Sequence, residues 1–193
     1  MIKFRFIAII LFLTVPILAQ SQDNAYQKGD KLLNLGTSLG YYGYGYFGNK
    51  SGFTLPVNAS FEYGITDQVS VGPYVGYARW SYEYNVGAGN TKYSWSFLAV
   101  GARGTFHYTE LLNELTGGDI NEQKIDLYVS ILMGLEFRSY KDDSGYNYYN
   151  NDTVLKLGPN AGVRYLLSKH IGVYAEGGRG SFGWLNFGFS AKF

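Results

Sequence analysis

The chain has 193 residues, which is the size of one domain. Only 16% of the residues are charged, 18% are aromatic, and 16 lysines and arginines nearly balance 15 acidic residues. Cysteine is absent, which excludes disulfides, thiol catalysis and cysteine-ligated metals. The net charge of +1 gives no basis for a nucleic-acid partner.

The first residues have the layout of a secretory signal peptide. Lys3 and Arg5 precede an apolar run over residues 6–18, and the small residue Ala19 comes before a polar stretch. The apolar run is shorter than a comfortable membrane-spanning helix, which disfavours the alternative of an uncleaved N-terminal anchor. We therefore expect cleavage after Ala19, followed by a flexible polar lead-in.

From residue 32 to the C-terminus, apolar and polar residues alternate with a period of two, which predicts β-strands. The pattern is clearest over residues 125–138, where seven apolar residues alternate with residues that are mostly polar or glycine. Segments of about ten residues suit tilted strands that cross a bilayer. Eight segments have this pattern: 32–41, 53–63, 69–80, 96–108, 125–138, 155–165, 171–176 and 185–193.

The connections between these segments alternate in length, as in outer-membrane barrels. Residues 64–68 and 167–170 form short turns. The connections expected on the opposite side are long and rich in polar and aromatic residues, and they cover 42–52, 81–92 and 140–153. Residues 109–124 form a long connection on the short side, and 110–115 is expected to contain one or two helical turns.

The alternation alone also fits a soluble barrel with an apolar interior. An eight-stranded barrel has little room inside, however, and the Leu, Ile, Phe and Tyr of the apolar face would overfill it. The Gly, Ser and Asn of the other face suit a crowded interior. The prediction is an eight-stranded antiparallel transmembrane β-barrel with a polar lumen and a lipid-facing apolar exterior. Pro73 and Pro159 lie within strands and are expected to mark bulges.

Acidic and basic residues alternate on the inward positions. We predict a salt-bridged plug, since buried charges persist only when they are paired. Glu136 is expected opposite Lys156, and Arg164 diagonal to Asp126. The alternative is that a water-filled lumen solvates these charges. The predicted lumen charge network consists of Glu62, Arg103, Asp126, Glu136, Arg138, Lys156, Arg164 and Glu176.

The C-terminus resembles the assembly signal of outer-membrane β-barrels, in which Leu185, Phe187 and Phe189 precede a terminal Phe193 at alternating positions. Residues 61–77 are similar to hairpins of the small porin-family barrels of Bacteroidota, of the OmpX- and OmpA-barrel type. This resemblance implies the outer membrane of a Gram-negative bacterium, with outer-membrane lipid, lipopolysaccharide and the barrel-assembly machinery as partners. The expected organisation is a signal peptide over 1–19, a flexible periplasmic lead-in over 20–30 and a barrel over 31–193.

Few residues suggest chemistry. His107 is expected to face inward near the periplasmic rim, and His170 lies in a turn. Outer-membrane lipid hydrolases place their histidine near the outer leaflet, so we interpret both histidines as structural and expect no catalytic site, metal or cofactor. The main prediction is a non-enzymatic protein with a structural or surface-binding role, and the alternatives are a narrow channel for small solutes and a lipid-modifying enzyme. The candidate loop surface for an unknown extracellular ligand contains Tyr44, Tyr46, Tyr82, Tyr84, Tyr146, Tyr148 and Tyr149.

Overall fold

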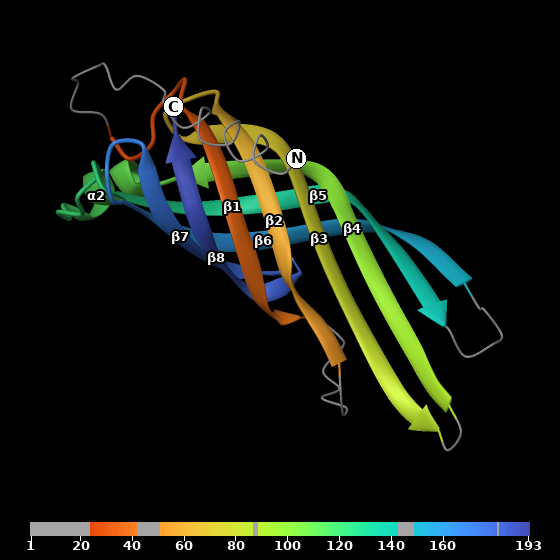
Figure 1. Cartoon of the computed structure of the whole chain (residues 1–193). Coiled ribbons are helices and arrows are strands. Elements are labelled where there is room, and N and C mark those ends of the chain that lie inside the picture. Colours follow the sequence, from red (N-terminus) through yellow and green to blue (C-terminus); the bar gives the residue numbers. More distant parts are fainter. Residues whose placement is uncertain (1–23, 42–50, 87–88, 143–148, 181) are drawn as a thin grey trace, which may run out of the picture.

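The strands form one closed antiparallel barrel in which each strand pairs with its sequence neighbours and β1 pairs with β8 (Figure 1). The computed structural model describes residues 24–41, 51–86, 89–142, 149–180 and 182–193, so the predicted signal peptide lies outside the described residues. The strands are β1 (Lys31–Tyr41), β2 (Ser51–Gly64), β3 (Val69–Val86), β4 (Gly89–His107), β5 (Ile125–Asp142), β6 (Tyr149–Leu166), β7 (Ile171–Gly178) and β8 (Gly183–Lys192).

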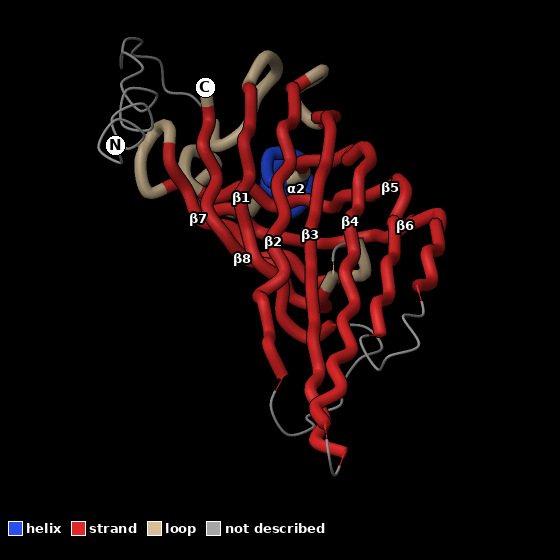
Figure 2. Tube along the Cα trace, turned by 45° about the vertical axis from the view of Figure 1, so that its right-hand side comes forward, coloured by secondary structure: helices blue, strands red, loops and turns tan. Residues whose placement is uncertain are grey.

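The barrel has two different ends. The turn end contains the connections 65–68, 108–124 and 167–170, together with residues 24–30 and Phe193. At the hairpin end, the β3–β4 and β5–β6 hairpins extend well beyond β1, β7 and β8 (Figures 1 and 2). β3 to β6 have 18 or 19 residues each, whereas β7 has 8.

Alternation places apolar side chains outside and polar side chains inside, as the sequence predicts. On β5, Ile131 and Met133 are 49% and 58% exposed, whereas Asp126 and Ser130 are buried. The predicted closed eight-stranded barrel with an apolar exterior is thus confirmed. Within the described part of the chain, no helix has both the length and the apolar character needed to cross a membrane.

Two of the expected long loops are largely strand. Residues 81–86 and 89–92 continue the β3–β4 ladder, with Tyr82 opposite Tyr93 and Tyr84 opposite Thr91. Likewise β5 continues to Asp142 and β6 begins at Tyr149. The polar-aromatic composition that suggested loops is also good strand composition, because Tyr and Thr favour extended backbone.

The bulge lies at a different proline from those expected. The β2–β3 register shifts between Thr54 and Val57, which brackets Pro56. The register is the same on both sides of Pro73, and Pro159 pairs with Ile131 in an unshifted ladder. A strand proline lacks one ladder donor but need not change the register.

The long connection at the turn end contains the expected short helix, α2 (Thr109–Thr116). It ends at Gly117, whose φ of 64° lies in the left-handed region that suits glycine at a helix C-terminus. Thr109 ties the helix to the barrel, because its Oγ1 accepts a hydrogen bond of 2.6 Å from the backbone N of Leu127.

The lumen is filled differently in its two halves. The half near the turn end is polar, as predicted, whereas the half near the hairpin end also holds an apolar cluster. Phe182, from the connection between β7 and β8, is 1% exposed inside this cluster. Gly180 lies beside it, and its backbone N donates to Oδ1 of Asn160 at 2.9 Å. The cluster consists of Tyr74, Ala78, Trp80, Phe97, Ala99, Leu132 and Phe182.

Candidate functional site

Arg103 forms the centre of the buried ion-pair network. Its Nη1 and Nη2 donate to the two carboxylate oxygens of Glu176 at 3.1 and 2.7 Å, and its Nε lies 3.2 Å from Oε1 of Glu62. Because these residues come from β4, β7 and β2, the network links strands across the lumen. Tyr128 adds a hydrogen bond of 3.2 Å to Glu176. The Arg103 and Glu62 side chains are 4% and 0% exposed, so these contacts replace solvent.

A second buried pair lies closer to the turn end. Asp126 on β5 is directly opposite Arg164 on β6, which corrects the expected diagonal placement. Arg164 Nη1 lies 2.5 Å from Asp126 Oδ2, and its side chain is 1% exposed. The guanidinium groups of Arg164 and Arg103 lie 5.3 and 5.5 Å from the centre of the Tyr128 ring. The electron-rich ring of Tyr128 therefore contacts both cations.

The third group lies toward the hairpin end. Lys156 Nζ is 3.0 Å from Glu136 Oε2, and Arg138 Nε is 2.8 Å from Glu136 Oε1. Glu136 is opposite Val154 rather than Lys156 in the ladder, so the expected register was wrong by two residues although the side chains meet. Lys156 Nζ also lies 4.3 Å from the centre of the Phe182 ring. The Arg138 side chain is 44% exposed, so this group reaches the barrel mouth.

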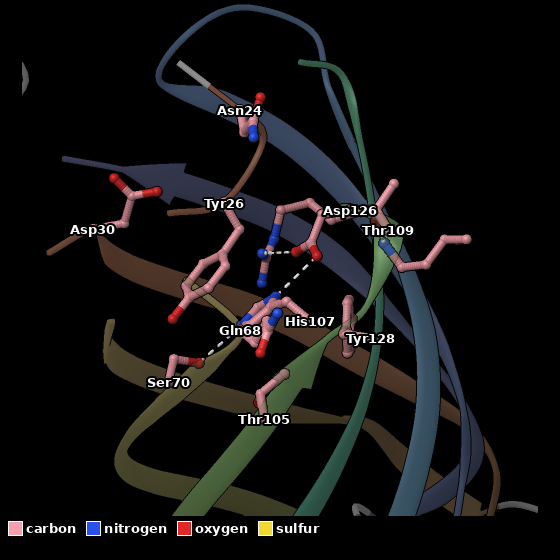
Figure 3. Close-up of polar contacts among 12 residues, drawn as sticks. Asn24, Tyr26, Asp30, Gln68, Ser70, Thr105, His107, Thr109, Asp126 and Tyr128 are labelled. Carbon is pink, nitrogen blue, oxygen red and sulfur yellow. Dashed lines mark hydrogen bonds and ion pairs between the residues drawn. The ribbon is translucent and has the colours of Figure 1, made fainter. Parts of the chain in front are cut away.

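His107 occupies the turn end of the lumen, at the inward position that the sequence predicts (Figure 3). Its Nδ1 lies 2.8 Å from Asp126 Oδ1, and its Nε2 lies 3.0 Å from Ser70 Oγ. Tyr26 stacks on the imidazole with ring centroids 3.5 Å apart. The sequence did not single out Ser70 or Tyr26, although the alternation already placed Ser70 on the inward face.

The Ser70, His107 and Asp126 contacts follow the order of a serine hydrolase triad. Ser70 also donates to Oε2 of Glu62 at 3.0 Å, so its single hydroxyl proton is directed to a carboxylate instead of to the imidazole. Ser70 is 0% exposed and lies in ladders with both β2 and β4, which engage the backbone N–H groups beside it. A nucleophile needs substrate access and free donors for an oxyanion, and this geometry offers neither.

Residues Asn24–Asp30 are bound across the turn end, which corrects the expectation of a flexible lead-in for this part. Lys192 Nζ donates to the Asn24 carbonyl at 2.8 Å and lies 3.2 Å from Asp30 Oδ2. Gly64 also holds the segment, since its N donates to the Asp30 carbonyl at 2.8 Å and its carbonyl accepts from Gly29 N at 2.9 Å. The segment is ordered because it buries an aromatic side chain and satisfies backbone groups at the open end of the barrel.

Tyr26 is the central side chain of this segment and is 6% exposed. Its hydroxyl donates to the Thr66 carbonyl at 2.8 Å. Burial, followed by the negative charges of Asp30 and Asp126, raises the pKa of Tyr26 well above its ordinary value. The hydroxyl therefore stays protonated and keeps this hydrogen bond throughout the physiological pH range.

The C-terminal residues close the barrel. Backbone N–H groups of Phe193 and Lys31 donate to each other's carbonyls at 3.0 and 3.2 Å. The four predicted assembly residues all point outward, and their side chains are 46%, 39%, 67% and 54% exposed for Leu185, Phe187, Phe189 and Phe193. Their role in assembly stays a prediction.

The loop tyrosines are only partly placed. Tyr44, Tyr46, Tyr146 and Tyr148 lie outside the described residues. Tyr82 and Tyr84 belong to β3 and Tyr149 begins β6, so these three are strand residues rather than loop residues, and their side chains are outside the described part.

Solved structures with the same fold are small outer-membrane barrels. OprG of Pseudomonas aeruginosa matches with a TM-score of 0.52 and 13% identity, over 89% of this chain and 99% of that chain. Ail, the attachment invasion locus protein of Yersinia pestis, in complex with the heparin analogue sucrose octasulfate, matches with a TM-score of 0.51 and 15% identity, over 86% and 95% of the two chains. No protein-family model matches the chain, and no curated protein sequence matches it significantly.

Proposed function

We propose that this chain is an integral outer-membrane protein of a Gram-negative bacterium, with a plugged lumen and a structural or surface-binding role. The observation that carries the proposal is that apolar side chains face outward and charged side chains face inward, which is the reverse of a soluble protein. Leu155, Leu157 and Phe189 are 70%, 62% and 67% exposed, while charged groups such as Glu62 and Arg164 are fully buried. Soluble proteins rarely expose such a continuous apolar surface, whereas a barrel in lipid requires one. The signal peptide, the Bacteroidota type, and contacts with lipopolysaccharide and the barrel-assembly machinery belong to the same proposal.

The filled lumen supports a barrel that is closed to solutes. Three obstacles lie in series along its axis. Tyr26 covers the turn end, the Arg103 ion pairs link opposite walls, and Phe182 fills the half near the hairpin end. Opening a path would require breaking buried ion pairs or removing packed aromatic side chains, both of which are costly. We therefore propose that the protein is not a general diffusion porin.

The surface role is supported by the extended hairpins. β3 to β6 project beyond β1, β7 and β8 and form a sheet that would stand outside the membrane (Figure 2). Ail shares the barrel fold and is named for attachment, and its structure contains a heparin analogue. An adhesive role for the projecting sheet of this chain, toward an extracellular ligand, is the corresponding proposal.

A narrow channel is the second candidate, and one observation favours it. Among the described residues, five buried polar atoms have no hydrogen-bond partner within the protein. Buried polar atoms of this kind are commonly satisfied by ordered water, so part of the lumen would be hydrated. The five atoms are Ser130 Oγ, Asn160 Nδ2, Arg164 Nε, Asn186 Nδ2 and Ser190 Oγ.

Three measurements test these proposals. The first is heat-modifiable migration of the protein from purified outer membranes, which should show a folded, membrane-integrated barrel; recovery in the periplasmic fraction would contradict the membrane assignment. The second is planar-bilayer recording of the folded protein, in which we expect no stable conductance steps. Reproducible conductance steps would refute the plugged barrel and support the narrow channel. An unchanged lipid A mass profile after gene deletion is expected for a non-enzymatic barrel, and a mass shift would favour the lipid-modifying alternative.

A further inference from the structure

The outward face of β3 to β6 changes its chemistry from one residue row to the next near the hairpin end. In one row, Tyr77, Leu98 and Phe137 lie opposite one another on successive strands, and each is about two-fifths exposed. In the next row toward the hairpin end, the corresponding side chains are polar. That row consists of Arg79, Ser96, Ser139 and Asn151. The boundary between these two rows is the edge of the apolar surface on the side of the hairpin end.

A groove of about 370 Å³ lies across these two rows. Tyr77, Leu98 and Phe137 form its apolar side, and the hydroxyl or amide groups of Ser96, Ser139 and Asn151 form its polar side. The volume falls within the range of about 300–1,000 Å³ that is usual for small-molecule sites. Aromatic rings beside hydroxyl and amide groups are suited to a sugar, which has both apolar faces and hydroxyl edges.

Positive charge flanks the polar side of the groove. Arg79 is exposed and has no ion pair or hydrogen bond through its side chain with any residue that the structure describes. Lys141 is also exposed and lies one row farther toward the hairpin end, opposite Ser94. Arg138 and Asp152 reach the groove from a pair of facing ladder positions, and their opposite charges offset one another. Arg79 therefore places a positive charge beside the polar side of the groove, which favours an anion.

We propose that this groove binds the phosphorylated sugar headgroup of an outer-leaflet glycolipid, with Arg79 as the main phosphate contact. The proposal rests on the proposed function, which places the apolar surface in lipid and the hairpin end outside. A headgroup then lies level with the polar row while its acyl chains follow the apolar surface below. A purely apolar ligand would leave Ser96, Ser139 and Asn151 without partners, and a free glycan has no acyl chains to cover the apolar surface below the groove.

The experiment uses the full mature barrel in phosphatidylcholine nanodiscs that contain bis-phosphorylated lipid A. Native mass spectrometry measures the fraction of barrels that retain one lipid A molecule as its amount is varied. The test variant is Arg79→Gln, and the matched control is Lys124→Gln, which removes an exposed positive charge at the turn end. Ser139→Leu fills the groove without changing its charge. Each substitution is at an exposed position and should leave folding intact.

We expect Arg79→Gln to weaken lipid A association about tenfold, since a charge-assisted hydrogen bond is lost, while Lys124→Gln retains wild-type association. Ser139→Leu should also weaken association, and dephosphorylated lipid A should bind the wild type and Arg79→Gln equally. Equal retention of bis-phosphorylated lipid A by the two charge variants would overturn the proposal. If a soluble glucosamine disaccharide phosphate bound as tightly as lipid A, the claim that the ligand is a lipid would be overturned. If the protein inserts into no bilayer, the proposed function fails, and this inference fails with it.

Discussion

Arg103→Met should be among the most damaging single substitutions in the barrel. Met fills a similar length but removes the guanidinium that contacts both Glu62 and Glu176 at 3.2 and 2.7 Å. Both carboxylates are buried and would lose their shared cation. Removing one partner of a buried ion pair costs about 3–5 kcal/mol, so we expect a loss of at least that size in the free energy of unfolding.

Reversible urea unfolding of the barrel in phospholipid vesicles, followed by tryptophan fluorescence, measures this change. The double variant Arg103→Met with Glu176→Gln should recover part of the loss, because one of the two unpaired charges is then neutral. Lys124→Met serves as the control and should change the free energy by no more than about 0.5 kcal/mol, since Lys124 is exposed. A loss below about 1 kcal/mol for Arg103→Met would mean that water solvates the lumen charges, and would refute the plug.

Other consequences can be measured separately. Deleting Phe193 should lower the amount of heat-modifiable protein in the outer membrane, because the terminal pairing with Lys31 is lost; normal insertion would contradict this. Tyr26→Ala should speed hydrogen exchange of the Gly29 and Gly64 amides that bind the lead-in across the turn end, whereas Tyr26→Phe, which loses only the Thr66 hydrogen bond, should change it little. The wild type should show only background labelling by a fluorophosphonate, and Ser70→Ala should leave that level unchanged. Labelling that depends on Ser70 would instead support a serine hydrolase.

The strand pattern was predictable because its cause is local. On β5, each apolar residue from Ile125 to Phe137 alternates with one that points inward, and this depends only on the pleat of the backbone. The residues at which the strands end on the hairpin side were harder to predict. Tyr82 and Tyr93 pair across the β3–β4 hairpin, but a stretch rich in Tyr, Asn and Gly has the composition of both a strand and a loop.

The membership of the lumen network could be predicted, but its pairing could not. Every residue of the network was identified as inward from its parity along the strand. Which of them meet depends on the stagger of the strands around the barrel. This stagger is set when the barrel closes and cannot be read from the sequence of any one strand. Arg103 and Glu176 are on β4 and β7, which are not ladder neighbours, and their bidentate contact crosses the interior. For the same reason, Ser70 could be placed inside without any indication that it meets His107.

The interior contacts also limit where function can reside. A ligand that entered from the turn end would have to displace Tyr26 and then the Asp126–Arg164 pair, and one from the hairpin end would have to displace Phe182. Each step exposes a buried aromatic side chain or a buried charge, and binding energy spent on such steps is not available for affinity. The outward face has no comparable barrier, because Arg79 and the row of serines beside it are already accessible and not committed to the lumen network. Recognition by this protein is therefore expected on its outer surface and projecting hairpins, with the ion pairs of the lumen holding that surface in a fixed shape.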